Sequence, residues 1–211
     1  MIIRNSAIVA ALCAALGVAA FAQGGGRPLS PAGTAAAQVG GKFEAGQDGP
    51  VYRGGKWIEI IYSRPLLRGR QPFTGEGASY GKIANPDAPV WRAGANQTTQ
   101  LKTEVPLIIN GKTIAPGTYT MFIDLRPNNW SLIVSTWEAQ VTYDPANTRQ
   151  LFGAFGYTPD KDVVRARMTL ATLPFTMEQM TWAFIDMSEI GGRIALIWDK
   201  SIASLPFKVG P

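Results

Sequence analysis

Two short stretches of the chain bring together side chains that are well suited to binding a small ligand. The first runs from Tyr62 to Arg70 and the second from Val90 to Asn96, and together they contain four arginines. A planar guanidinium binds carboxylate, sulfate or phosphate oxygens in pairs, and it also stacks on flat rings. We therefore select as candidate ligand-binding residues Tyr62, Ser63, Arg64, Arg70, Tyr80, Lys82, Trp91, Arg92 and Asn96.

The same arginines also fit a structural role, and the sequence favours that role. Arginines near strand ends pair with carboxylates or loop carbonyls and hold connections in place. Four acidic residues lie nearby in the sequence as partners: Glu59, Glu76, Asp87 and Glu104. Buried ion-pair networks and ligand sites look alike at this level. Likewise, Gly94 and Asn96 suit a tight turn before a strand better than an anion-binding backbone loop.

Most catalytic machinery is excluded by composition. The chain has no histidine, which rules out Ser-His-Asp and Cys-His nucleophiles and histidine-ligated zinc or copper. Its single cysteine, Cys13, lies in a segment that we expect to be removed. Ser63 and Lys82 are the one pair to consider as a Ser-Lys dyad, although Ser63 belongs to an alternating strand. We predict no catalytic residue, no metal ligand and no cofactor.

The first 22 residues have the pattern of a secretory signal peptide. Arg4 precedes an apolar stretch from Ala7 to Ala20, and a small-x-small cleavage site ends at Ala22. That stretch is too short to span a bilayer, so no membrane span is expected in the mature protein. We expect a periplasmic or extracellular protein. The net charge of +5 is dispersed, which argues against nucleic acid as a partner.

The rest of the chain divides into an arm and one domain. Residues 23–55 are rich in Gly, Ala and Pro and read as a flexible arm. Residues 56–211 read as a single all-β domain, an antiparallel β-sandwich or a closely related barrel. We expect strands at Lys56–Ser63, Gln97–Glu104, Val105–Ile114 with a hairpin at Asn110-Gly111, Thr118–Leu125, Trp130–Ser135, Val163–Ala171, Met177–Met187, Arg193–Asp199 and Ser201–Val209.

Two segments leave a choice open. Met177–Ile190 is compatible with a helix, but the adjacent Gly191-Gly192 turn favours a strand. Thr136–Asp162 is a longer connection without a clear pattern. Of the six tryptophans, four fall in strand patterns and are expected in the core, whereas Trp91 and Trp137 lie in connections and are the better candidates for a surface that binds sugars.

The order of these motifs resembles a family of secreted bacterial proteins, domain-of-unknown-function family 2911. The resemblance starts at Leu29 and runs to the end of the chain. It rests on Tyr62–Pro65, Gly69-Arg70, Tyr80–Lys82, Trp91–Asn96, Ile109–Lys112, Ala115–Tyr119 and Leu196–Val209. It implies a secreted β-rich domain without an assigned activity.

The chain departs from the family pattern at three places. Gln97 stands where family members carry a glutamate, residues 83–89 are an extra segment, and Phe152-Gly153 replaces a Trp-Gly pair. The glutamine weakens any role for a carboxylate at that position in metal binding or proton transfer.

Three functions from different classes follow. The leading hypothesis is a non-enzymatic domain that binds an anionic or polyhydroxylated ligand, or an envelope partner, through an Arg/aromatic face. The alternatives are a carbohydrate hydrolase or lyase with two carboxylates, and a purely structural assembly module. We also predict that Arg64, Arg70 and Arg92 converge on one cavity or one cluster of carboxylates, because both motifs end strands at the same edge.

Overall fold

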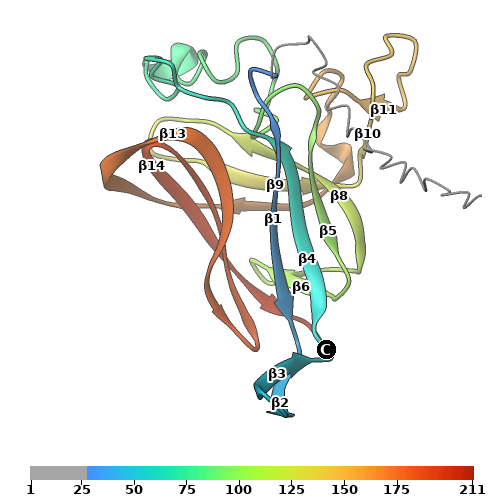
Figure 1. Ribbon diagram of the computed structural model, residues 1–211. Helices are drawn as coiled ribbons and strands as arrows, with labels where there is room; N and C mark the ends of the chain where they lie inside the picture. The colour runs from blue at the N-terminus through green and yellow to red at the C-terminus, as the bar shows by residue number, and fades with distance from the viewer. Residues whose placement is uncertain (1–27) are drawn as a thin grey trace, which may run out of the picture.

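The computed structural model describes residues 28–211, so the predicted signal peptide lies outside the described residues. The described chain is built from antiparallel strands and two 3₁₀ turns, η1 (Gly77–Ser79) and η2 (Pro159–Lys161) (Figure 1). No helix among these residues is both long enough and apolar enough to cross a membrane.

Two sheets form the body of the molecule. The first has six antiparallel strands in the order β1 (Ala32–Val39), β4 (Lys56–Ser63), β5 (Thr99–Thr103), β8 (Gly117–Asp124), β9 (Ser131–Ser135) and β12 (Asp162–Arg167). The second has four, in the order β13 (Thr169–Ser188), β14 (Gly191–Val209), β6 (Leu107–Ile109) and β7 (Lys112–Ile114). Two small ribbons complete the set: antiparallel β2 (Lys42–Gly46) with β3 (Gly49–Arg53), and parallel β10 (Glu138–Ala139) with β11 (Gln150–Leu151).

The two larger sheets pack face to face as a β-sandwich. Alternate residues of the six-stranded sheet, such as Ile58 and Ile60 of β4, point inward and are fully buried. They share one apolar core with residues of β14, such as Leu196 and Trp198. Since side chains alternate along a strand, this pattern fixes which face of each strand meets the core.

The outer face of the six-stranded sheet carries a second, smaller core. Phe122 of β8 and Ile133 of β9 point to this side and are also fully buried. They are covered by Val90 and by residues of the connection between β9 and β12, including Leu151 and Tyr157. The irregular connection is therefore packed onto the sheet by apolar contacts.

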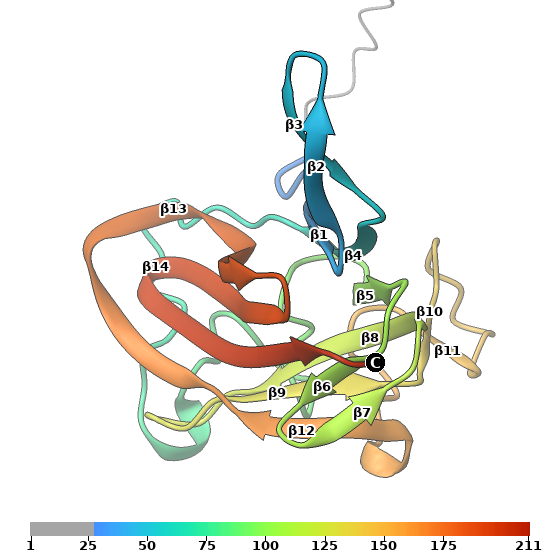
Figure 2. The same ribbon diagram turned by 90° about the horizontal axis from the view of Figure 1, so that it is seen from below.

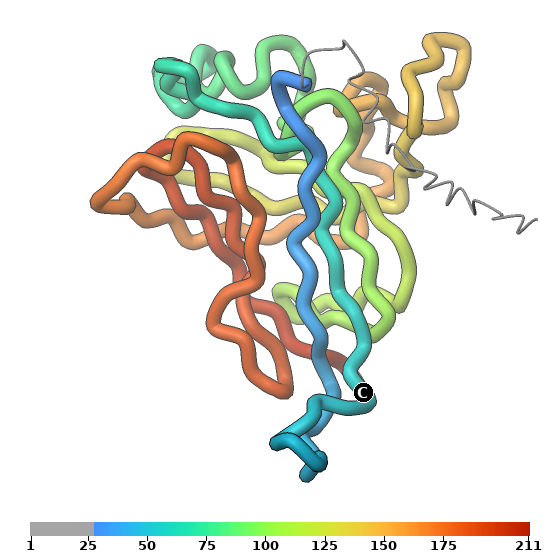
Figure 3. Tube along the Cα trace, viewed as in Figure 1, coloured from blue at the N-terminus to red at the C-terminus, as the bar shows by residue number. Residues whose placement is uncertain are grey.

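The two ends of the molecule differ in character. The β4–β5 connection and the β9–β12 connection gather at one end, where the chain trace forms loops (Figure 3). The β2–β3 hairpin projects from the opposite end, away from both large sheets (Figure 2). The loops that follow the two arginine-containing motifs thus lie at the looped end.

Several predicted strands are confirmed. β4 has the predicted bounds, and β13 covers Met177–Met187 as a strand rather than a helix. The Asn110-Gly111 hairpin joins β6 to β7, and both residues have positive φ, at 50° and 75°. Positive φ at both central positions is the reason why Asn-Gly favours this turn.

Other boundaries need correction. The segment predicted as a flexible arm, residues 23–55, contains three strands from Ala32 onward, and β1 pairs along its whole length with β4. The single strand predicted at Val163–Ala171 is divided at Met168, where the chain passes from the first sheet to the second. The two strands predicted at the C-terminus are one strand, β14, with positive φ at Asp199.

Candidate functional site

The two arginine-containing motifs meet at the looped end of the sandwich, as the sequence predicts. The Tyr62 hydroxyl accepts a hydrogen bond from the backbone N–H of Trp182 (3.0 Å), and the indole Nε1 of Trp182 donates to the carbonyl of Ala93 (2.9 Å). A Cβ placed on Gly94 would lie 3.2 Å from the Ser63 carbonyl oxygen. Glycine is thus needed where the second motif crosses the first.

Arg64 lies along the crossing between the two sheets. Its Nη2 donates to Thr181 Oγ1 of β13 at 3.5 Å, while its buried Nε has no partner among the described residues. Its aliphatic stem covers Gly33 of β1, where a Cβ would overlap the Cδ of the arginine. The side chain therefore fills the space between β1 and β13 and links the edges of the two sheets.

Arg70 closes the turn that follows. Its Nε and Nη2 donate to the carbonyls of Leu67 (3.1 Å) and Leu66 (2.5 Å). The turn between them includes Arg68, which has a φ of 49°. Two carbonyls of a tight turn thus receive donors from one guanidinium.

Arg92 has the same function in the second motif. Its Nη1 donates to the carbonyl of Asn96 (2.7 Å), a residue with a φ of 56°. The guanidinium also lies over the Phe155 ring, with its Cζ 5.8 Å from the ring centroid, and against Gly153. Burial lowers the pKa of Arg92 below that of a free guanidinium.

The predicted convergence of the three arginines on carboxylates is wrong. The ion pairs found in residues 28–211 involve Arg53, Arg126 and Arg165 only. Arg64, Arg70 and Arg92 are instead bonded to a hydroxyl or to carbonyls of nearby turns, and none of them lines any of the clefts described below. The structural role therefore accounts for their contacts, with carbonyls in place of acidic partners.

The remaining candidates are dispersed. The Tyr80 hydroxyl accepts from Trp130 Nε1 (3.1 Å), and Lys82 Nζ donates to the Pro86 carbonyl (2.9 Å). Ser63 Oγ donates to Gln97 Oε1 (3.4 Å), and Ser63 and Tyr62 line a small cleft of about 250 Å³ with Gln97 and Gln100. Ser63 and Lys82 have different partners, so the structure gives no support for a Ser-Lys dyad.

Two predictions about tryptophans are also wrong. Trp91, expected at the surface, is 1% exposed and stacks on Trp198 with the ring centroids 6.0 Å apart. Its backbone pairs with Ile123 of β8, which places the connection inside the core. Trp57, expected in the core, is 44% exposed because it lies on the face of β4 opposite to the buried Ile58 and Ile60. Trp137 is half-buried and does line a cleft.

The connection between β9 and β12 is ordered by one buried glutamine. Gln140 Nε2 donates to the carbonyls of Asn147 (2.9 Å), Gln150 (2.9 Å) and Asp144 (3.3 Å), and its Oε1 accepts from the Asp144 N–H (2.8 Å). Asn147 Oδ1 in turn accepts from the N–H groups of Arg149 and Gln150. Buried amide groups with all these partners hold an irregular loop in one conformation.

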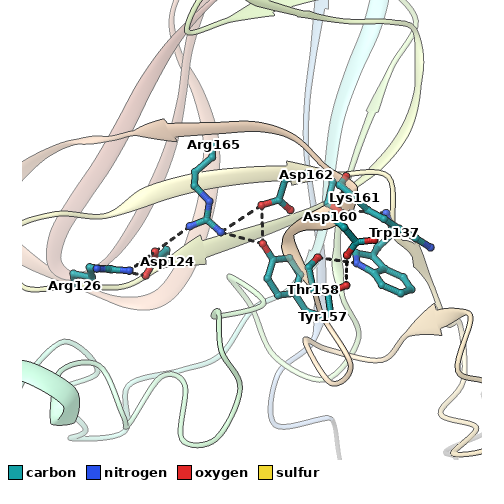
Figure 4. Close-up of polar contacts among 10 residues, drawn as sticks. Asp124, Arg126, Trp137, Tyr157, Thr158, Asp160, Lys161, Asp162 and Arg165 are labelled. Atoms are coloured by element: carbon teal, nitrogen blue, oxygen red, sulfur yellow. Dashed lines mark hydrogen bonds and ion pairs between the residues drawn. The ribbon is translucent and has the colours of Figure 1, made fainter.

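A polar network fixes the far end of the same connection (Figure 4). The Tyr157 hydroxyl donates to Asp162 Oδ2 (2.8 Å), and Arg165 donates to both groups and to Asp124 Oδ2 (3.0 Å). Burial raises the pKa of Asp162 in spite of these contacts, and burial together with Asp162 raises the pKa of Tyr157. The network joins β8, β12 and the loop.

The largest cleft described here lies beside this connection and measures about 650 Å³. We call it the Trp137 cleft; its walls are formed by Thr136, Trp137, Glu138, Arg149 and Lys161 together with a turn at Asn147, Thr148 and Gln150. Lys161 Nζ lies 3.6 Å from the centroid of the Trp137 ring, a cation–π contact that holds the ammonium in the cleft. The Glu138 carboxylate accepts from Gln150 Nε2 (2.9 Å).

Charge in the Trp137 cleft is left partly uncompensated. Among residues 28–211, the Arg149 guanidinium has neither an ion pair nor a side-chain hydrogen bond, and the Lys161 ammonium contacts only the Trp137 ring. One carboxylate, that of Glu138, faces these two cations. The cleft thus carries a net positive charge and exposed hydroxyls.

A second cleft of about 200 Å³ lies on the other side of the turn. We call it the Tyr143 cleft; it is lined by Tyr143, Asp144, Pro145, Phe152, Phe155 and the same turn residues, Asn147, Thr148 and Gln150. Each of the five clefts described in residues 28–211 has at most one carboxylate in its lining. No cluster of metal-binding side chains occurs in this part of the chain.

The sequence did not identify most of the residues of the Trp137 cleft. Arg149 and Lys161, which line the cleft, lie in the long connection, where no periodic pattern marks them. The same is true of Gln140, which orders the loop. Two signals were present: the length of the connection, and Trp137 inside it. Long loops on a rigid scaffold often carry function.

Comparison with known proteins identifies the family of this chain but assigns no activity. A family model described as a protein of unknown function (DUF2911) matches residues 50–207. No curated protein matches the chain, and no solved structure does either.

Proposed function

Because the chain belongs to the DUF2911 family of proteins of unknown function, we propose a function from its geometry alone: the domain binds a small anionic, hydroxyl-bearing ligand, such as a sugar acid, in the Trp137 cleft. The observation that carries this proposal is the pair of cations, Arg149 and Lys161, that face one cleft without carboxylate partners. A planar guanidinium and an ammonium together suit a carboxylate, sulfate or phosphate group.

The rest of the cleft supports the same ligand class. Thr136 and Thr148 offer hydroxyls, and the amide of Gln150 is held in place by Glu138. The volume falls within the range of about 300–1,000 Å³ that is usual for small-molecule sites. The Gln140 contacts keep the loop in one conformation before a ligand arrives, which lowers the entropic cost of binding.

The two alternatives lack a comparable observation. A glycoside hydrolase needs two carboxylates about 5–10 Å apart across a cleft, and the Trp137 cleft contributes Glu138 alone. A purely structural module would leave the two uncompensated cations unexplained. We also propose, from the N-terminal sequence, that the domain acts after export to the periplasm or the cell exterior.

Calorimetric titration with inorganic sulfate, glucuronate and neutral glucose tests the proposal. Arg149→Ala and Lys161→Ala should each weaken binding of sulfate and glucuronate by roughly 3- to 10-fold, as expected for partly exposed charge contacts. Glu138→Gln keeps the hydrogen bond to Gln150 but removes the negative charge, so it should strengthen anion binding by about 2- to 5-fold. Glucose should bind more weakly than glucuronate.

Lys42→Ala is the matched control, since it removes an exposed cation from β2 at the opposite end of the molecule (Figure 1). It should leave affinity unchanged. If Arg149→Ala, Lys161→Ala and Glu138→Gln all bind sulfate and glucuronate as the wild type does, the assignment of this cleft is wrong. It is also wrong if no anion binds.

A further inference from the structure

The Trp137 cleft and the Tyr143 cleft share a wall. Asn147, Thr148 and Gln150 line both, so the two hollows lie on either side of one turn. With about 200 Å³, the Tyr143 cleft is smaller than an ordinary ligand site. It is better suited to extend a neighbouring site than to act alone.

The two clefts differ in chemistry. The Trp137 cleft presents Arg149 and Lys161, whereas no cation lines the Tyr143 cleft. The latter instead presents two aromatic rings, Tyr143 and Phe155, each 58% exposed. Two exposed rings in the lining of one cleft provide apolar surface of the kind that takes part in binding. A ligand that fills both clefts would carry an acidic group on one side of the turn and an uncharged ring on the other.

The Tyr143 ring is held in position. It packs against Phe152 with the centroids 5.3 Å apart and a tilt of 56°, and Phe152 belongs to the same cleft. Asp144, the one acidic residue there, accepts a hydrogen bond from the N–H of Ala146 (2.9 Å). The exposed side of the Tyr143 ring is therefore a fixed apolar surface on which the C–H face of a sugar can pack.

From these features we infer that the ligand is an acidic oligosaccharide, with an acidic unit in the Trp137 cleft and a neighbouring neutral unit against Tyr143 in the Tyr143 cleft. This inference rests on the proposed function, because it extends the same anion site. A sugar chain of this kind crosses the turn at Thr148, a residue that lines both clefts.

The alternative occupant is an acidic peptide, and the geometry argues against it. A peptide binds in a groove of this kind mainly through main-chain hydrogen bonds to a free strand edge. Between the two clefts the chain forms a turn, and the N–H groups of Arg149 and Gln150 already donate to Asn147 Oδ1 (3.1 and 3.2 Å). The Asn147 N–H donates to the carbonyl of Asp144. Three of the four backbone N–H groups of the turn, those of Asn147, Arg149 and Gln150, therefore already have acceptors. Within the described chain the Thr148 N–H alone is left, which is too few for the row of main-chain hydrogen bonds that holds a peptide.

Calorimetry with the full chain distinguishes these possibilities. The probes are glucuronate, a tetrasaccharide of alternating glucuronate and N-acetylglucosamine, a tetramer of galacturonate, and an acidic peptide containing tyrosine. We expect the alternating tetrasaccharide, which can place a neutral unit against Tyr143, to bind 10-fold or more tightly than glucuronate and more tightly than the galacturonate tetramer, which has no neutral unit. Tyr143→Ala should remove most of that gain and leave the affinity for glucuronate within about 2-fold of the wild type.

Phe43→Ala is the matched control: it removes a ring that is more exposed (71%) from β2 and should change neither affinity. Arg149→Ala should weaken the binding of glucuronate and of the alternating tetrasaccharide. If glucuronate binds but the alternating tetrasaccharide does not bind more tightly, or if Tyr143→Ala weakens binding of glucuronate and of this tetrasaccharide alike, the extension is wrong although the anion site stands. Tighter binding of the peptide than of any sugar would also overturn the inference. Loss of all anion binding would instead refute the proposed function.

Discussion

Three of the four arginines of the sequence motifs, Arg64, Arg70 and Arg92, differ from the two cations of the Trp137 cleft in what their charged groups contact. Arg70 and Arg92 donate to carbonyls of their own tight turns, whereas Arg149 and Lys161 have no oxygen partner among the described residues. Tight turns with positive φ leave carbonyls without backbone partners, and one guanidinium satisfies two of them. A concentration of arginines beside strand ends can therefore mark difficult turns, while the cations open to a ligand lie elsewhere.

The largest effect on folding is expected where the two motifs meet. Trp182→Ala removes a fully buried ring and its indole hydrogen bond to the Ala93 carbonyl, so it should lower the free energy of unfolding by about 3–5 kcal/mol. Urea denaturation measures this. Trp137→Ala, in the half-buried wall of the cleft, should cost less than about half as much. If the two variants lose equal stability, the contact between the motifs is no more important for folding than the wall of the cleft.

An intermediate effect should separate Arg92 from Arg149. Arg92→Ala loses a hydrogen bond of a half-buried charged group and its contact with Phe155, so unfolding should become easier by about 1–3 kcal/mol. Affinity for glucuronate should not change. Arg149→Ala should show the reverse: weaker binding, and a free energy of unfolding within about 0.5 kcal/mol of the wild type. If Arg92→Ala leaves stability intact and abolishes binding, the roles of the two arginines are exchanged.

The smallest effect concerns the pH dependence of stability at Asp162. Because burial raises the pKa of its carboxyl, the folded chain binds this proton more tightly than the unfolded chain. As the pH rises from about 4 through the raised pKa, the free energy of unfolding should fall on account of this group. Asp162→Asn should lack this decrease in urea denaturation at a series of pH values. An identical pH profile in both proteins would contradict the expectation.

The β-sandwich could be predicted because apolar and polar residues alternate along its strands. β4 has β-branched apolar residues at every second position. Asn110-Gly111 predicts the hairpin between β6 and β7 because both residues readily adopt positive φ. β1 could not be predicted in the same way, because its Ala- and Gly-rich sequence has little preference for a strand. β1 is a strand because its backbone pairs with β4.

The contact between the motifs was predictable, whereas the Trp137 cleft was not. Pro65 follows the end of β4, and the second motif passes close to this point, so that a Cβ on Gly94 would lie 3.2 Å from the Ser63 carbonyl oxygen. The cleft depends on Gln140, which bonds to carbonyls four to ten residues away. A glutamine inside a loop has no pattern that distinguishes it from an exposed one, since the distinction lies in burial and not in sequence.

The hydrogen bonds of Gln140 determine the conformation of the loop, whereas the exposed side chains of the loop determine its surface chemistry. One buried side chain, with help from Asn147, holds the backbone of residues 140–151. Val141, Thr142, Pro145, Thr148 and Arg149 have exposed side chains that make no side-chain hydrogen bond within the described chain. These positions are open to replacement without loss of the loop conformation. Such a loop can be diversified by mutagenesis to recognise new ligands, with the sandwich serving as an unchanged scaffold.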